Sequence, residues 1–259
     1  MMRVMTQPAL FVGHGNPMHA ISENAYTRAW RALGASLARP KAILAISAHW
    51  YVPGTRVTAM AKPKTIHDFG GFPDELYQVE YPAPGSPELA RRVRDLLAPL
   101  DVGLDESWGL DHGTWSVLVH MFPAADIPVV QLSIDRTKPA SFHHELGARL
   151  APLRGEGVLV LGSGNVVHNL ETVAWGDPSA GPYDWAARFD AKVRELLDAK
   201  DHASLVDYAK LGPDALLSVP TPDHYLPLLY VAGASPGVVP TYPCGGFDLG
   251  SISMLSVRF

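Results

Sequence analysis

Cysteine is almost absent from this sequence, and its scarcity excludes two kinds of architecture. Cys244 is the only cysteine in 259 residues, so no disulfide can form within the chain and a cysteine-based zinc site is not expected. A chain without internal disulfides is typical of a reducing cytoplasm, which is where we expect this protein. Cys244 itself lies in a glycine-rich loop, and we interpret it as a thiol without a catalytic role.

Long apolar runs and blocks of positive charge are missing as well. Glycine, proline or histidine interrupts the apolar runs before they reach the ~18 residues that a membrane-spanning helix needs. The formal net charge is -5, and the lysines and arginines are scattered along the chain. We therefore expect neither a membrane nor a nucleic acid as a partner.

Three common catalytic signatures are also absent. The chain has no Walker loop for phosphates, no His-Glu-x-x-His helix and no Gly-x-Ser-x-Gly elbow. Segment 162–167 begins like a dinucleotide-binding loop, but valine takes the place of its third glycine. We interpret Ser163, within this segment, as a turn residue rather than a nucleophile.

The apolar runs that are present predict an α/β fold. Runs at 9–12, 42–46 and 157–161 are continuously apolar, and the run at 129–134 is apolar apart from Gln131 and Ser133, as in parallel strands that are buried on both faces. A last strand is expected within 251–257. Stripes with helical spacing lie between these runs, at 89–100, 142–153, 185–197 and 226–231. We predict a single domain over 1–259, with a central, mostly parallel sheet flanked by helices.

Histidine is abundant, with eleven in the chain, and three of these residues stand just after predicted strands. His14 follows the first run, His49 ends the second, and His168 follows the run at 157–161. The carboxyl ends of strands in an open α/β sheet form the edge at which ligands bind. Imidazole is also a common ligand of iron, zinc, copper and nickel. The pattern therefore predicts a metal site at this edge.

Two further histidines lie in segments rich in glycine, proline and aspartate. His112 and His224 both stand near expected helix starts or sharp turns, and we expect at least three of these five residues to share one site. His67, in a long aromatic loop, is a candidate for contact with a substrate. We interpret the other histidines as solvated or structural residues: His143, His144 and His202 as solvated, His19 and His120 as structural.

Six short motifs occur in an order that resembles one known family. They are Gly-His-Gly-Asn-Pro at 13–17, Ser-Ala-His-Trp at 47–50, Ile-His-Asp-Phe-Gly-Gly-Phe-Pro at 66–73, Asp-His-Gly-Thr-Trp at 111–115, Gly-Ser-Gly-Asn-Val-Val-His-Asn at 162–169 and Pro-Thr-Pro-Asp-His-Tyr-Leu-Pro-Leu at 220–228. Together, from about residue 8 to the C-terminus, the chain is similar to the class III extradiol ring-cleavage dioxygenases. The resemblance is strongest to their 4,5-DOPA extradiol dioxygenase branch.

The resemblance implies a role for each histidine of the site. His14 and His49 match the metal ligands, and His224 occupies the region of the third ligand. His168 matches an acid/base beside the metal, which in this branch is also a zinc ligand, and His112 matches a residue that faces the substrate. The wider class holds Fe(II) with two histidines and a glutamate, whereas the segment at 220–228 offers only Asp223 and His224. One metal ion is implied, with Fe(II) expected for dioxygenase activity and Zn(II) as the alternative.

The implied activity is the opening of a catechol ring, such as that of DOPA, with O2 to give a muconic semialdehyde. A catechol must lose protons to chelate a metal, and histidine can accept them near neutral pH. His168 is the first choice for this base and His112 the second. Two other functions stay open at this point: a zinc hydrolase of amides or esters, and a metal-binding module of the same fold without catalysis.

Overall fold

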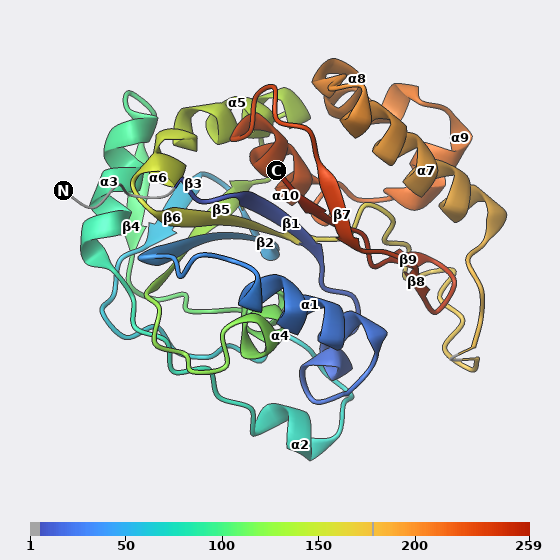
Figure 1. Cartoon of the computed structure of the whole chain (residues 1–259), viewed down its shortest axis with the longest axis horizontal. Helices are drawn as coiled ribbons and strands as arrows, with labels where there is room; N and C mark the ends of the chain where they lie inside the picture. The colour runs from blue at the N-terminus through green and yellow to red at the C-terminus, as the bar shows by residue number, and fades with distance from the viewer. Residues whose placement is uncertain (1–5, 178) are drawn as a thin grey trace.

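The computed structural model describes residues 6–177 and 179–259, and these ranges are built around one large sheet (Figure 1). Its strands lie in the order β4-β3-β5-β2-β6-β1-β10-β7, and the four from β5 to β1 are parallel. β10 pairs antiparallel with β1, and β3 pairs antiparallel with β5. The strands are β1 (Ala9–Gly13), β2 (Ala42–Val52), β3 (Thr55–Thr58), β4 (Val102–Asp105), β5 (Val129–Asp135), β6 (Val158–Gly164), β7 (Thr241–Cys244) and β10 (Ser256–Arg258), beside a small pair, β8 (Phe247–Asp248) and β9 (Ile252–Ser253).

The prediction of a mostly parallel sheet flanked by helices is confirmed, and the apolar runs are its four central strands. These strands are mostly apolar because both faces are covered: Leu10 and Val12 of β1 pack into one core, and Ala9 and Phe11 into the other. The strand predicted within 251–257 is instead divided into β9 and β10, which pair with different partners.

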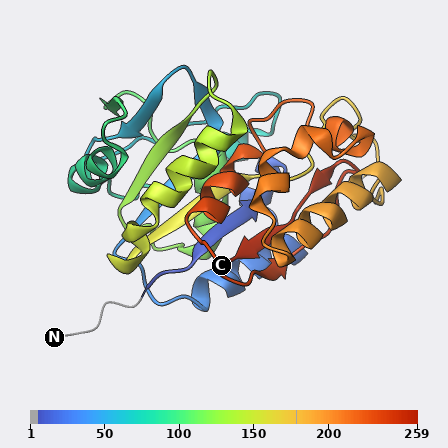
Figure 2. The ribbon, with the colours of Figure 1, turned by 90° about the horizontal axis from the view of Figure 1, so that it is seen from above.

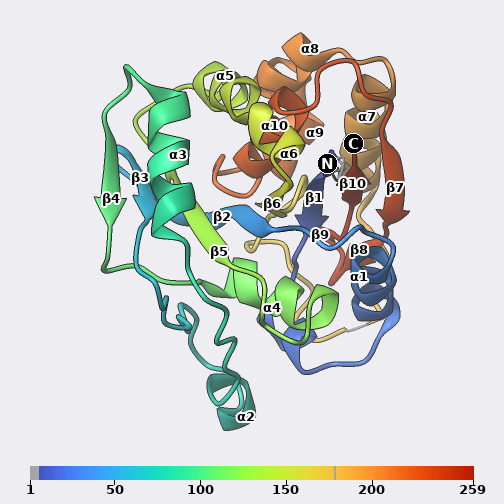
Figure 3. The ribbon, with the colours of Figure 1, turned by 60° about the vertical axis from the view of Figure 1, so that its left-hand side comes forward.

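Helices cover both faces of the sheet. In Figure 1, α5, α6 and α10 lie above it and α1 and α4 below it, and Figure 2 shows the upper layer from above. Figure 3 shows α2 at the tip of the long loop between β3 and α3. The helices are α1 (Ala25–Ala35), α2 (Asp74–Tyr77), α3 (Pro87–Leu97), α4 (His112–Met121), α5 (Ala140–Leu150), α6 (Pro152–Gly155), α7 (Asp184–Asp198), α8 (His202–Val206), α9 (Pro213–Ser218) and α10 (Leu226–Gly233), with short 3-10 turns η1 (Pro17–Ala20) and η2 (Tyr208–Lys210). Within the described ranges, no helix combines the length and the apolar character needed to cross a membrane.

The packing of α10 against α5 explains why one histidine prediction is wrong. α10 is buried on all sides, and Gly147 of α5 lets it approach so closely that a Cβ there would lie 2.1 Å from the Tyr230 carbonyl oxygen. This contact buries His143, which was expected to be solvated, and places its Nδ1 3.0 Å from the Tyr230 hydroxyl. His144 and His202 are half-buried and contact each other at 3.1 Å.

The register of the sheet brings the ends of β1 and β6 beside the middle of β2. Gly13 of β1 is paired with Gly164 of β6, and Ser47 of β2 is paired with Ser163. β2 does not end at His49 as predicted but continues to Val52, and its register against β5 shifts between Ile46 and Tyr51. His49 therefore lies within this irregular stretch, which turns its side chain toward the edge that carries His14.

Candidate metal centre

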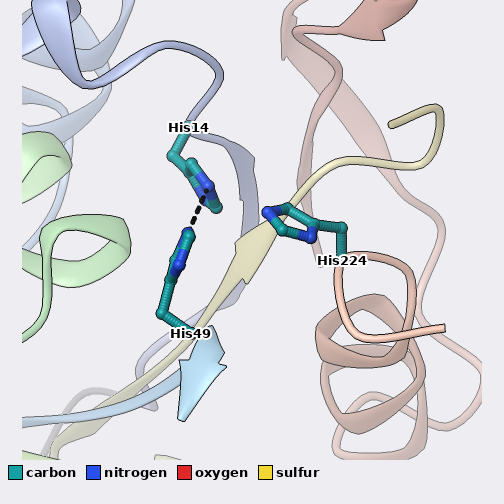
Figure 4. A group of neighbouring side chains, drawn as sticks. All are labelled: His14, His49 and His224. Carbon is teal, nitrogen blue, oxygen red and sulfur yellow. Dashed lines mark hydrogen bonds between the residues drawn. The ribbon is translucent and has the colours of Figure 1, made fainter. Parts of the chain in front are cut away.

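Three of the predicted histidines meet at this edge. His14 follows β1, His49 lies in β2 and His224 comes two residues before α10. One ring nitrogen of each lies within 4.8 Å of those of the other two. Nε2 of His14 and Nε2 of His49 are 3.1 Å apart, and the ring of His224 approaches them from the side of α10 (Figure 4).

The other ring nitrogen, Nδ1, has an acceptor in all three residues. Nδ1 of His14 lies 3.0 Å from Ser163 Oγ, which itself donates its proton to the Gly113 carbonyl oxygen. Nδ1 of His49 lies 3.2 Å from Asp68, and Nδ1 of His224 contacts Asp223. Since these three acceptors take the Nδ1 protons, each imidazole is left with a lone pair on Nε2.

These residues fit a transition-metal ion. Lone pairs that converge at about 3 Å repel each other unless a proton or a cation lies between them. Two nitrogen ligands at about 2.0–2.1 Å from one ion are themselves roughly 3 Å apart, the separation seen between His14 and His49. An outer acceptor on Nδ1 is also the usual companion of a metal-bound histidine. We conclude that the three imidazoles form a candidate metal centre.

Burial keeps most of these imidazoles neutral and therefore able to bind a cation. Burial, together with His49 and His224, holds the pKa of His14 well below its ordinary value. Burial also lowers the pKa of His224, against the opposing effect of Asp223. Burial would lower the pKa of His49 too, but Asp68, Asp111 and Asp223 outweigh it, so that this pKa is raised.

A glycine allows the third histidine to reach the other two. A Cβ on Gly164 would lie 2.1 Å from the carbonyl oxygen of His224, so no larger residue fits at the end of β6. The Asn165 backbone N–H donates to the same carbonyl oxygen at 2.9 Å. This contact holds the segment before α10 against β6 and places the His224 ring beside β1.

His112 and His168 lie beside the three converging imidazoles but outside their group. His112 is the first residue of α4, where Asp111 is the N-cap, and the centre of its ring is 3.9 Å from that of His49. The ring of His168 stacks on that of His224 at 3.5 Å, with an angle of 4° between them. Burial, and next the neighbouring His224, keeps the pKa of His168 well below its ordinary value.

All five histidines open onto one cavity of about 180 Å³. Apart from histidine and Asn16, its wall is glycine or apolar: Gly15, Pro17, Phe72, Leu170, Trp175 and Ile252. A larger hollow of about 410 Å³ lies between α1 and the end of α4, but only His120 among the histidines lines it. The cavity with the five histidines is therefore the candidate active site, suited to a flat apolar ring beside polar atoms.

Two residues of this site were missed or misread in the sequence. Asp68 contacts both His49 and His112, whereas its neighbour His67 lies outside the described cavity wall, with Nε2 3.0 Å from the Val79 carbonyl oxygen. Ser163 is not a turn residue but belongs to β6, where its hydroxyl contacts His14. The Ile-His-Asp motif at 66–68 did contain a sequence signal for Asp68, because it places this acidic residue next to His67.

Ser163→Ala is expected to weaken metal binding about tenfold, because His14 Nδ1 loses its acceptor. The dissociation constant of Zn(II), measured by competition with a chelating dye, would check this. Ser133→Ala in β5 is the control: its hydroxyl contacts Arg56 and Gly54, so metal binding should not change. Equal affinities in all three proteins would contradict a supporting role for Ser163.

The chain is similar to known proteins over most of its length. The family described as the catalytic LigB subunit of aromatic ring-opening dioxygenase matches residues 7–242. The chain is 56% identical to a 4,5-DOPA dioxygenase extradiol of Escherichia coli K12, over 97% of this chain and 94% of that protein. It is 42% identical to a protein of the same name from Beta vulgaris, over 87% and 85% of the two chains.

The fold has a close counterpart among solved structures. The crystal structure of an uncharacterized protein from Escherichia coli K12 superposes with a TM-score of 0.86 and 50% sequence identity, over 98% of this chain and 99% of that one. The similarity therefore extends over the whole sheet and both helical layers.

Proposed function

Because the chain belongs to the family of catalytic LigB subunits of aromatic ring-opening dioxygenases, we propose that it opens a catechol ring with O2 by extradiol cleavage. The product is a muconic semialdehyde that carries both atoms of O2, so the protein is an oxidoreductase. Relatives named for 4,5-DOPA make a DOPA-like catechol the first substrate to test. We further propose that residues 1–259 act as one catalytic domain.

The observation that carries this proposal is the convergence of three imidazoles on a small, largely apolar cavity. We assign His14, His49 and His224 as the ligands of one ion and propose that this ion is Fe(II). A set of three histidines also suits Zn(II), which would compete for the same place. Bound Fe(II) would supply adjacent coordination positions for a catecholate and O2.

The protein's own residues supply binding and proton transfer. Phe72, Leu170 and Trp175 would cover the faces and edge of the aromatic ring and exclude water from it. His168, neutral and beside His224, would accept the proton of a catechol hydroxyl and later return a proton to the product. His112 would hold the substrate's oxygen atoms in place, whereas His67 lies outside the cavity wall and would not contact the substrate.

The experiment that tests this function compares two metals and two kinds of substrate. Protein loaded with Fe(II) without oxygen is mixed with air and a panel of catechols that includes DOPA. We expect O2 uptake and a yellow ring-opened product with Fe(II), and neither with Zn(II). A hydrolase would be favoured instead if the Zn(II) form hydrolysed amides or esters and the Fe(II) form took up no O2. A non-catalytic module would be favoured if the protein bound metal and catalysed neither reaction. Family membership favours neither alternative.

A further inference from the structure

We infer that Asp68 is a positioning residue that connects the metal ligand His49 to the substrate-facing His112. The inference rests on the function proposed above, and it concerns a residue from the loop between β3 and α3. The side chain of Asp68 is only 18% exposed and lies between the two imidazoles. Each of its carboxylate oxygens therefore has a different partner.

One oxygen is directed to the metal ligand. Oδ2 of Asp68 lies 3.2 Å from Nδ1 of His49. An ionised carboxylate can only accept here, so it orients the ring and leaves Nε2 of His49 directed at Nε2 of His14.

The other oxygen is directed to the start of α4. Oδ1 of Asp68 accepts the backbone N–H of His112 at 2.9 Å and lies 3.0 Å from its Nδ1, which has no aligned hydrogen-bond partner among the described residues. The first N–H groups of a helix lack partners within the helix and attract negative charge. Asp68 therefore holds the first turn of α4, and with it the ring of His112, in a fixed place.

The same loop also forms part of the cavity wall. Phe69 follows Asp68, and the centre of its ring is 5.4 Å from that of His112, while Phe72 lines the cavity itself. Independent backbone bonds hold this segment, because Ile66 N donates to Leu110 O at 2.7 Å and Leu110 N donates to Lys64 O at 2.9 Å. Loss of the Asp68 charge should therefore leave the loop in place.

An asparagine at position 68 has nearly the shape of aspartate but cannot accept on both sides. Its amide offers one oxygen and one NH2 group, and both neighbours of Asp68 are donors. In either orientation one donor faces the NH2 group. Asp68→Asn should therefore lose the contact with His49 in one orientation of the amide and the contact with His112 in the other, so that the positioning of each histidine is weakened in part of the molecules.

The test uses Asp223→Asn as a matched control, because Asp223 supports the ligand His224 but has no contact with His112 among the described residues. We expect both variants to bind Zn(II) about 10–100-fold more weakly than the wild type in a chelator competition. Only Asp68→Asn should also bind 4-nitrocatechol about tenfold more weakly when Zn(II) is saturating, measured from the absorbance of this probe. Equal probe affinities in the two variants would overturn the inference.

A double-mutant cycle separates this role from a general loosening of the loop. If Asp68 acts on the probe through His112, Asp68→Asn should have no further effect on 4-nitrocatechol affinity in a His112→Ala background. A full additional loss there would overturn the inference. If Asp68→Asn does not fold, Asp68→Glu is tested instead, because it keeps the negative charge and both acceptor oxygens. The Asp68→Glu protein should then bind both Zn(II) and the probe more tightly than the Asp68→Ala protein does. Equal affinities of these two variants would overturn the inference. None of these readouts requires turnover, so a failure of the Fe(II) protein to open any catechol would contradict the proposed function alone.

Discussion

His49→Ala is expected to lose the bound metal and to lower catechol turnover to the rate of a reaction without enzyme. The change removes one of three converging nitrogens and leaves only two imidazoles, which cannot fill the three protein positions of an open catalytic site. The Asp68 carboxylate also loses one of its partners. Elemental analysis after dialysis, beside O2 uptake with a catechol, measures both effects.

The fold of His49→Ala should persist. The His49 side chain is 19% exposed, and the core residues of β2, such as Leu44 and Ile46, lie before it in the strand. We expect Tm to fall by only a few degrees. His202→Ala is the control, since it removes a half-buried histidine that contacts His144 and lies outside the cluster. A His49→Ala protein that keeps full metal content would contradict the assignment of this ligand.

His168→Ala is expected to keep its metal and to bind catechol, but to lose about 10²–10⁴-fold in kcat. The reason is its position: its ring lines the cavity and stacks on His224, yet it does not belong to the three residues whose nitrogens converge. Its loss should therefore remove a proton acceptor and leave the ligand set intact. The measurement is metal content together with kcat and KM from O2 uptake.

His112→Ala separates proton transfer from substrate placement. The substitution should raise KM for the catechol more than it lowers kcat, and the variant protein should retain its metal.

The opposite role of His168 has a different signature. If His168 were chiefly a ligand, its replacement would lower the metal content instead, and excess Fe(II) would restore part of the activity. Full metal content and full activity in both variants would contradict both assignments.

Much of the fold could be predicted because burial on two faces leaves a clear pattern. The runs that became β1, β5 and β6 are mostly apolar and are buried at every position, and this pattern occurs where helices cover both sides of a parallel sheet. The outer strands β3 and β4 on one side of the sheet and β7 on the other were not predicted. They are only four residues long and partly exposed, so their sequences contain little periodic signal.

The histidines of the site could be found because each stands in a short segment rich in turn residues. Their supporting residues could not, since such contacts join distant parts of the chain. Asp68 is 19 residues from His49 and 44 from His112 in sequence, so the acidic residue of the Ile-His-Asp motif gives no indication of which histidines it contacts. Ser163 was misread because glycines on both sides indicate a turn. In the structure Gly162 and Gly164 belong to β6, where they make room for Pro227 and His224.

The three imidazoles come from positions 14, 49 and 224, and this wide spacing has a consequence for biosynthesis. β1, which leads to His14, lies between β6 and β10, both of which come from the second half of the chain. A ribosome must release β6 and α10 before the three nitrogens can meet, so an ion cannot template the early, cotranslational stages of folding. Loading of an ion at this centre would therefore follow synthesis of the segment that carries His224, and protein made without added metal should still bind an ion that is supplied afterwards.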